Sequence, residues 1–452
     1  MPLSLDQEEM SNTRDLDFME EFLAAEQAKQ LVRFSTAGSV DDGKSTLIGR
    51  LLYDSQNVYE DHVRAVTKAA TATVAAAIDF AQLTDGLRAE REQGITIDVA
   101  YRYFSTAHRK FIIADTPGHE QYTRNMVTGA STADLTIILV DASRGILPQS
   151  RRHALIASLL GIRHVVVAIN KMDLVGWSRE RFVQLQREFQ ALNEQLNLEH
   201  LSFVPLSALM GDMVVARGDH LGWYDGPTLL ELLENAPLDD TTGAELRFPV
   251  QLVSRPGLPG TYARGYMGRI EAGRIAVGER IVVQPSGQSA RVAAIVTFDG
   301  HLESACAPQS VTLVLDSELD VSRGDLICTE LAPARPVRQF DAMLCWMDAE
   351  PLDAGRKYIV QHTTRRAKAV IDTVDYVLDV GTLLPRRASA PLAMNEIGRV
   401  HLSTREPLML DDYSESRSTG GFIVIDELSN RTVAAGMALA GAGDARFGAS
   451  HG

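Results

Sequence analysis

The chain has 452 residues, of which 45% are hydrophobic and 23% charged, a balance typical of a globular protein with about two to four domains. Its formal net charge of −15 argues against long-range attraction to nucleic acid. Three cysteines are too few and too widely spaced for a disulfide framework or a zinc site, which favours a reducing compartment. The acidic N-terminus lacks a signal-peptide pattern, and the longest apolar run, 135–140, is too short to span a membrane. We therefore predict a cytoplasmic protein with no membrane partner and no nucleic-acid partner.

Residues 1–30 are polar and Glu-rich, with Leu16, Met19 and Leu23 spaced for one face of a helix. This extension is predicted to pack on the surface or to dock a partner. From 31 to 235, near-continuous apolar strands alternate with helices, which predicts a parallel sheet covered on both faces, with its chemistry at the carboxyl ends of the strands. The expected strands are 31–36, 110–114, 135–140, 165–169 and 203–206, and the expected helices include 45–52, 149–160 and 179–196.

Two β-rich modules follow a turn-rich linker, at 246–335 and at 337–440, and the pattern of each predicts a small antiparallel β-barrel. The first module has expected strands at 248–253, 265–271, 280–284, 290–298 and 311–315. The second has them at 341–347, 358–362, 367–377, 398–402 and 421–426. Residues 441–452 are rich in Gly, Ala and Ser and are predicted to be a flexible tail.

A phosphate-binding loop motif, G-x-x-x-x-G-K-[ST], lies between the first predicted strand and the helix after it. Its residues are Gly38, Ser39, Val40, Asp41, Asp42, Gly43, Lys44 and Ser45, with Thr46 next in the helix. The glycines allow backbone N–H groups to face a triphosphate, and Lys44 can reach the β- and γ-phosphates. Ser45 offers a hydroxyl ligand to Mg²⁺. The segment therefore predicts a nucleoside triphosphate site.

Two further segments have the properties of nucleotide switches. Asp115 follows the second predicted strand, 110–114, and is itself followed by Thr116, Pro117 and Gly118. Asp115 is placed to hold Mg²⁺ through water, and the Gly118 N–H to contact the γ-phosphate. Thr96, within Gly94-Ile95-Thr96, is a candidate ligand of Mg²⁺ and of the γ-phosphate when its segment closes. Each motif is weak alone, because each also fits a turn or a strand end.

The base specificity is predicted by Asn170-Lys171-Met172-Asp173, which follows the strand 165–169. The Asp173 carboxylate can accept hydrogen bonds from N1–H and from the exocyclic amino group of guanine, whereas adenine has neither donor there. Ser207, Ala208 and Leu209 follow the next strand and can add backbone contacts to the base. These motifs occur in one order at the ends of α/β elements. The predicted fold is therefore an α/β P-loop GTPase domain, 31–235, followed by two antiparallel β-barrel domains, with GTP and Mg²⁺ as ligands.

The segments 91–97 and 115–122 resemble those of translational GTPases of the elongation factor Tu class, as does one GTPase domain followed by two barrels. In that family the histidine after D-x-P-G orients the attacking water, so the resemblance makes His119 the candidate catalytic residue beside Lys44 and Thr96. Val40 and Ile95 match the apolar gate around this histidine. Ser39 and Asp42 differ from the histidines that occupy these positions in factors that carry aminoacyl-tRNA.

The run 38–54, together with 91–98, 101–104, 118–129 and 420–426, more closely resembles the GTPase subunit of bacterial sulfate adenylyltransferase. That resemblance implies a GTP-hydrolysing subunit of a heteromeric enzyme that acts in sulfate assimilation and cysteine biosynthesis. It also implies a smaller catalytic partner subunit, which forms adenosine 5′-phosphosulfate and pyrophosphate from ATP and sulfate. Some members carry a kinase domain with a second P-loop, and since this sequence contains no second such motif, we expect no kinase activity.

Two alternatives remain open from the sequence. One is a translational GTPase, which the run 38–54 and the lack of a clear basic cluster in the first barrel disfavour. The other is a nucleotide-binding scaffold without catalysis, which unchanged GTP turnover after substitution of His119 would favour.

Overall fold

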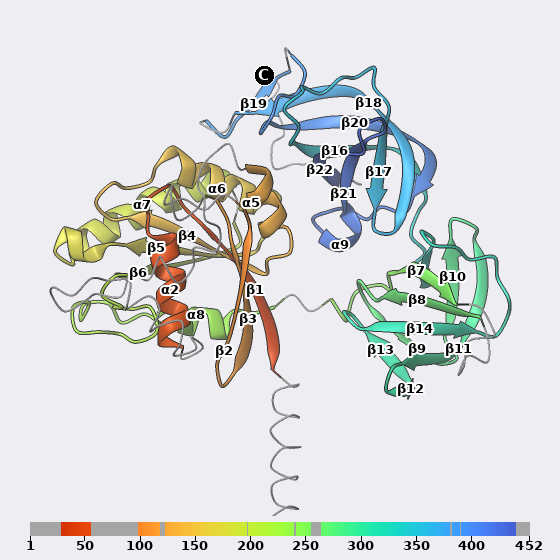
Figure 1. Cartoon of the computed structure of the whole chain (residues 1–452), viewed down its shortest axis with the longest axis horizontal. Helices are drawn as coiled ribbons and strands as arrows, with labels where there is room; N and C mark the ends of the chain where they lie inside the picture. The colour runs from red at the N-terminus through yellow and green to blue at the C-terminus, as the bar shows by residue number, and fades with distance from the viewer. Residues whose placement is uncertain are drawn as a thin grey trace, which may run out of the picture. The chain divides into compact units, whose positions relative to one another are not determined.

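The computed structural model describes residues 29–55, 98–117, 123–196, 198–238, 241–254, 264–379, 382–388 and 390–439. The predicted N-terminal helix, Thr96, Gly118, His119 and the predicted tail lie outside these residues. The chain divides into two compact units, of which the first carries a mixed sheet and the second two barrels (Figure 1).

The first unit contains a six-stranded sheet in the order β2-β3-β1-β4-β5-β6. Its strands are β1 (Gln30–Ala37), β2 (Ala100–Ser105), β3 (Arg109–Asp115), β4 (Leu135–Asp141), β5 (His164–Asn170) and β6 (His200–Pro205). Five strands run parallel, in agreement with the predicted pattern of apolar runs. All seven residues of β4 are buried, as expected of a strand covered on both faces.

The expectation of a wholly parallel sheet is wrong at one edge. Strand β2 pairs antiparallel with β3, from Ala100 opposite Asp115 to Ser105 opposite Lys110. A short turn joins the two strands into a hairpin, and a hairpin is necessarily antiparallel. Tyr101 and Tyr103 are exposed on this edge strand, whereas Phe104 is buried and stacks on Phe111 with ring centroids 4.6 Å apart. The aromatic residues Tyr101, Tyr103 and Phe104, which have high strand propensity, could have revealed this strand.

Helices cover both faces of the sheet (Figure 1). They are α2 (Lys44–Asp54), α5 (Thr123–Ala130), α6 (Pro148–Leu159), α7 (Arg179–Leu196) and α8 (Leu229–Asn235), with the 3₁₀ turn η3 at Met172–Val175. Helix α8 begins with a capping box in which Thr228 and Glu231 satisfy each other's backbone N–H groups. No helix within the described ranges is long and apolar enough to cross a membrane.

The second unit contains two closed antiparallel barrels of six strands, which confirms the predicted fold class. Contact between β10 and β11 closes the first barrel, and contact between β17 and β18 closes the second. The first barrel and its short additional strands comprise β7 (Phe248–Ser254), β8 (Gly265–Arg269), β9 (Arg274–Ala276), β10 (Arg280–Gln284), β11 (Gln288–Thr297), β12 (Gly300–Leu302), β13 (Ser304–Cys306), β14 (Ser310–Leu315) and β15 (Leu326–Thr329). The second comprises β16 (Val337–Trp346), β17 (Tyr358–His362), β18 (Arg365–Leu378), β19 (Pro385–Arg387), β20 (Ile397–Leu408), β21 (Gly421–Asp426) and β22 (Thr432–Leu439), with the short helix α9 (Arg417–Gly420).

Each barrel has an apolar interior of its own. Phe248, Tyr266 and Ile295 belong to the first core, and Trp346 and Tyr358 to the second. Six strands of the two barrel modules were not predicted: β9, β12, β13, β15, β19 and β22. All but β22 have three or four residues, too few to show alternation, and β22 is rich in Ala and Gly, which have low strand propensity.

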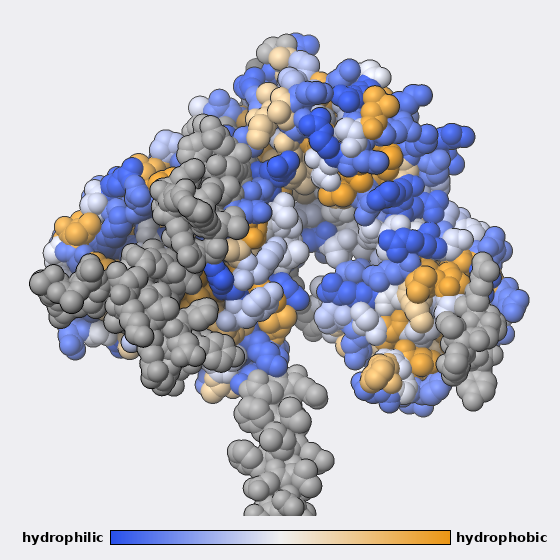
Figure 2. Space-filling view, in the orientation of Figure 1, coloured by the Kyte–Doolittle hydropathy of each residue, from blue (hydrophilic) through white to orange (hydrophobic). Residues whose placement is uncertain are grey.

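The surface is mainly hydrophilic on the face drawn in Figure 2, where hydrophobic residues occur in small groups. The most exposed large hydrophobic side chains are Phe298, Leu331 and Leu428, and they belong to three different loops or turns. Scattered residues of this kind are normal for a protein surface. The polar interior of the first unit is the more informative feature.

Candidate functional site

The P-loop follows β1 and leads into α2, in the position predicted from its motif. Gly43 has φ +96°, and a Cβ there would lie 2.5 Å from Asn170 Nδ2, so both its conformation and the available space require glycine. Lys44 is 8% exposed and donates to the Gly38 carbonyl at 2.8 Å and to the Ser39 carbonyl at 2.9 Å. Burial lowers the pKa of Lys44, while Asp115 and Asp42 oppose this shift. The loop thus holds a buried cation beside the backbone.

A histidine that the sequence analysis missed supports this loop. The Gly38 N–H donates to His153 Nδ1 at 3.0 Å, and this hydrogen bond joins the loop after β1 to helix α6. Burial, with the nearby Lys44 and Arg152 charges, lowers the pKa of His153 to about 3. The neutral imidazole is therefore able to accept this hydrogen bond at physiological pH. The sequence did contain a signal for this role of His153. The histidine lies near the start of the helix that follows the carboxyl end of β4, on the side of the sheet where the P-loop lies.

The side chain of Asp42 folds back onto its own loop. Its Oδ2 accepts from the Ser39 N–H at 2.6 Å, and Oδ1 has no hydrogen-bond partner within the described residues. Desolvation raises the pKa of Asp42. Ser39 and Asp42 are buried, whereas Val40 is half-buried and Asp41 exposed. The two positions that differ from tRNA-carrying factors are thus internal supports of the loop.

Asp115 and Thr116 lie at the carboxyl end of β3, next to β1. Asp115 Oδ1 accepts from Thr36 Oγ1 at 3.1 Å, and Thr116 Oγ1 donates to the Thr36 carbonyl at 2.6 Å. Asp115 is 4% exposed and contributes to the electrostatic environment of Lys44. The structure therefore brings the predicted switch carboxylate to the same edge of the sheet as the P-loop. Pro117 is described, and Gly118 and His119 are beyond the described part.

Asn170 connects the P-loop with the loop after β6. Its Nδ2 donates to the Asp42 carbonyl at 2.8 Å, and its Oδ1 accepts from the Ala208 N–H at 2.9 Å. Asn170 is 2% exposed, so both hydrogen bonds are buried. One carboxamide therefore joins the predicted phosphate segment to the predicted base segment.

The neighbouring residues complete the base-side loops. Lys171 has φ +61° and pairs with Asp141 at 2.9 Å, a partner that the sequence analysis missed. Burial would raise the pKa of Asp141, but hydrogen bonds from Ser143 and Lys171 outweigh it and keep the pKa below its usual value. Ser207 Oγ donates to Asp173 Oδ1 at 2.7 Å, while Met172 is buried and Leu209 exposed. The carboxyl ends of five strands, β1, β3, β4, β5 and β6, and the loops after them thus supply this edge, where α/β sheets bind ligands.

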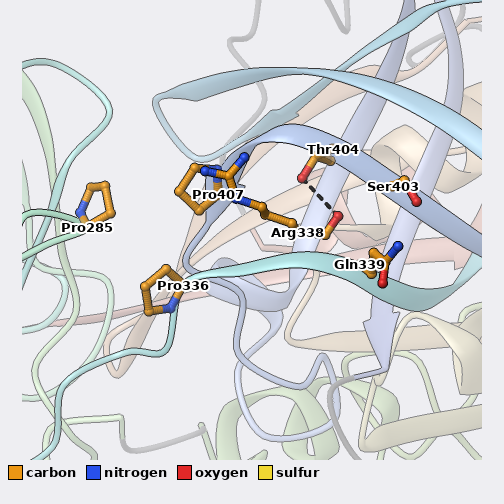
Figure 3. Close-up of a pocket in the computed structure, with 7 residues that line it drawn as sticks. All are labelled: Pro285, Pro336, Arg338, Gln339, Ser403, Thr404 and Pro407. Carbon is orange, nitrogen blue, oxygen red and sulfur yellow. Dashed lines mark hydrogen bonds between the residues drawn. The ribbon is translucent and has the colours of Figure 1, made fainter.

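Two hollows are lined by other residues. One, of about 310 Å³, is at the amino ends of β4, β5 and β6, where His164 and His200 stack with ring centroids 4.6 Å apart. The other is an open groove of about 720 Å³ in the second unit (Figure 3). Arg338 of β16 and Thr404 of β20 line the groove, and Thr404 Oγ1 donates to the Arg338 carbonyl at 3.2 Å. Neither hollow is lined by a residue of the predicted nucleotide site.

Comparisons with known proteins agree with this geometry. Residues 29–238 match the family model described as the elongation factor Tu GTP binding domain, and 339–439 match the GTP-eEF1A C-terminal domain-like model. "Sulfate adenylyltransferase subunit 1" of Salmonella paratyphi C is 51% identical over 93% of this chain and 88% of its own length. The chain belongs to the sulfate adenylyltransferase subunit 1 family. This confirms the family predicted from the segments 38–54 and 91–98.

Other members of the sulfate adenylyltransferase subunit 1 family and related proteins are similarly close. The protein of that name in Bacteroides fragilis is 50% identical over 92% of this chain and 88% of its own length. "Bifunctional enzyme CysN/CysC" of Mycobacterium tuberculosis is 52% identical over 90% of this chain and 67% of its own length. Among solved structures, sup35 complexed with GMPPNP aligns with 91% of this chain and 94% of its own, at 24% identity and a TM-score of 0.41, a likeness too low to support an argument.

Proposed function

We propose that the chain is the GTP-hydrolysing subunit of a heteromeric sulfate adenylyltransferase and binds Mg²⁺·GTP at the carboxyl edge of its sheet. The observation that carries this proposal is the double hydrogen bonding of Asn170, to the Asp42 carbonyl and to the Ala208 N–H. A single buried side chain then sets the spacing between the segments that hold phosphate and base. Gly38–Thr46 would hold the phosphates, and Asn170–Asp173 with Ser207–Leu209 the guanine.

The residues at the phosphate end fit a magnesium nucleotide. Gly43 leaves the room that a Cβ would fill, and Lys44 supplies a buried cation. Ser45 and Thr96 would coordinate Mg²⁺ directly, with Asp115 held near by Thr36 and acting through water. When bound, Mg²⁺ neutralises part of the charge of the β- and γ-phosphates. Lys44 and the loop N–H groups would stabilise charge that develops on the phosphates.

Hydrolysis is assigned by the family resemblance to residues outside the described ranges. His119 would position the attacking water, and Thr96 and Gly118 would hold the switch segments against the γ-phosphate. Loss of that phosphate would release both segments, the kind of order change by which GTPases signal to other domains or subunits. The barrels and a partner subunit would respond to that change in the switch segments.

The partner would be the smaller, catalytic subunit, with which this chain forms a heterodimer or a larger assembly in the cytoplasm. That partner would form adenosine 5′-phosphosulfate and pyrophosphate from ATP and sulfate, drawn forward by coupled GTP hydrolysis. The words "subunit 1" in the names of the Salmonella and Bacteroides relatives support a multi-subunit enzyme.

The test is to co-purify the chain with the small subunit from the same organism and to measure sulfate-dependent pyrophosphate release with and without GTP. We expect GTP to raise the final amount of product and GTP hydrolysis to require ATP and sulfate. A Lys44→Met chain, co-purified in the same way, is the control for contaminating GTPases. Pyrophosphate release that does not change when GTP is added, together with GTP hydrolysis that does not change when sulfate is added, would overturn the proposed coupling.

A further inference from the structure

Arg50, on helix α2 two turns after the P-loop, contacts the loop that follows β6. Its Nε donates to the Ala208 carbonyl at 3.2 Å and its Nη2 to the Leu209 carbonyl at 2.5 Å. Its side chain is 15% exposed, and a Cβ on Gly211 would lie 3.4 Å from its Cζ. The guanidinium therefore lies within the turn formed by 208–211, where its planar fork can hold two consecutive carbonyls.

A sequence of hydrogen bonds leads from this guanidinium to the candidate guanine-binding carboxylate. The Leu209 carbonyl and the Met210 N–H belong to one trans peptide, so they point in opposite directions. Arg50 holds the carbonyl, and the N–H on the other side donates to Ser207 Oγ at 3.2 Å. The Ser207 hydroxyl in turn donates to Asp173 Oδ1 at 2.7 Å.

Each step of this network restricts one rotation. The Arg50 contacts orient the peptide planes of 208–210. Because the Ser207 oxygen accepts the hydrogen bond from the Met210 N–H, the Ser207 hydroxyl proton is available to point at Asp173. That proton limits rotation of the Asp173 carboxylate about its terminal torsion, which is otherwise broad. The second carboxylate oxygen is then presented in one direction. Hydrogen bonds to a charged acceptor are worth more when the acceptor is held in place before the ligand arrives.

We propose that Arg50 is a positioning residue for base specificity, which aligns Asp173 with guanine through Leu209, Met210 and Ser207. This inference rests on the proposed guanine site at Asp173. It gives helix α2 two roles, because the same helix begins at Lys44 and ends next to the base-side loop. The chemical class of ligand is a 2-amino-6-oxopurine nucleotide.

The experiment compares Arg50→Met, which keeps the stem and removes the donors, with Arg50→Lys, which keeps the charge and loses the fork. Asp54→Asn is the matched control, since Asp54 pairs with Arg50 at 3.6 Å but touches none of the carbonyls in the network. Dissociation constants are measured for GDP, IDP and ADP by competition with a fluorescent GDP analogue. Inosine lacks the 2-amino group and adenine lacks both donors, so the three ligands report the Asp173 contacts separately while they share the diphosphate.

In Arg50→Met we expect GDP affinity to fall roughly tenfold or more, IDP affinity to fall less, and ADP affinity to stay within about twofold. Arg50→Lys should be intermediate, and Asp54→Asn should match the wild type. An Arg50 whose role is only to stabilise α2 would weaken all three ligands equally, and an unchanged GDP-to-ADP ratio would overturn the proposal. A wild-type chain with no preference for GDP over ADP would instead overturn the guanine site itself.

Discussion

The two ends of the six-stranded sheet share the same strands but carry different kinds of side chain. At the carboxyl end, Asp115, Asp141 and Asn170 are 2–4% exposed, and each has a defined hydrogen-bond partner. At the amino end, His164 and His200 begin β5 and β6, stack on each other and line a hollow. Burial of polar groups is costly unless they are paired, so their concentration at one end of the sheet supports the proposal that the nucleotide binds there.

Removal of the buried cation at the carboxyl end should have the largest effect. Lys44→Met abolishes the charge that the phosphates require, and we expect GTP affinity to fall roughly 100-fold or more. The methionine relieves the desolvation of a buried ammonium but leaves the Gly38 and Ser39 carbonyls without this donor, and because the two effects oppose each other the melting temperature should change little. Isothermal titration with Mg²⁺·GTP and a thermal melt measure the two effects. GTP affinity within about tenfold of the wild type would contradict the assignment of Lys44.

Asn170→Ala should affect both binding and stability. The substitution leaves the Asp42 carbonyl and the Ala208 N–H without their partner, a loss of about 2–4 kcal/mol in unfolding free energy. It also releases the base loop from the P-loop, so GTP affinity should drop by roughly tenfold or more. Chemical denaturation and nucleotide titration on the same preparation test this. A variant that is destabilised yet binds GTP normally would show that Asn170 only supports the fold.

The sequence predicted the architecture more readily than it predicted the residues that hold the candidate site in place by hydrogen bonds. Long apolar runs such as 135–140 and glycine positions such as Gly43 predicted the sheet and the P-loop, because burial and backbone conformation are local in sequence. The sequence did not predict strand β2 or the short barrel strands, because hydrogen bonding to neighbouring strands, and not a local sequence pattern, determines where they form. The partners His153 and Asp141 were also missed, because their contacts join residues 115 and 30 positions apart. The roles of Thr96 and His119 stay predictions.

His153 offers a pH-dependent test of the carboxyl end. Its pKa in the folded chain, about 3, lies below the unfolded value near 6.5, so protonation favours the unfolded chain. The stabilisation is complete above about pH 6.5 and is lost as pH falls towards 3, by roughly 1.4 kcal/mol per pH unit. His153→Asn keeps an acceptor for the Gly38 N–H and cannot titrate.

We therefore expect the unfolding free energies of the wild type and His153→Asn to be similar at pH 7. The variant should be more stable than the wild type by about 2 kcal/mol at pH 5. Urea denaturation at both pH values measures this, with His153→Leu as the variant that leaves the Gly38 N–H unpaired. Equal slopes with pH for wild type and His153→Asn would contradict a neutral, buried His153.

We expect the smallest effect on GTP binding from a substitution at the amino end of the sheet. His200→Ala removes one ring of the stacked pair at the exposed start of β6, far along the strand from the nucleotide loops. We expect GTP affinity within about twofold of the wild type and a loss of stability of about 1 kcal/mol or less. A large loss of GTP binding in this variant would show that the two ends of the sheet are coupled.

Guanine selectivity at the carboxyl end is the central claim, and competition binding of GTP, XTP and ATP tests it most directly. The wild-type chain should prefer GTP to ATP by roughly 100-fold or more, since Asp173 has no donor to accept from adenine. Asp173→Asn exchanges an acceptor for a donor and should shift the preference from GTP to XTP, while Lys44 keeps the phosphates bound. Equal affinity for GTP and ATP, or an Asp173→Asn chain that still prefers GTP, would contradict the proposed site.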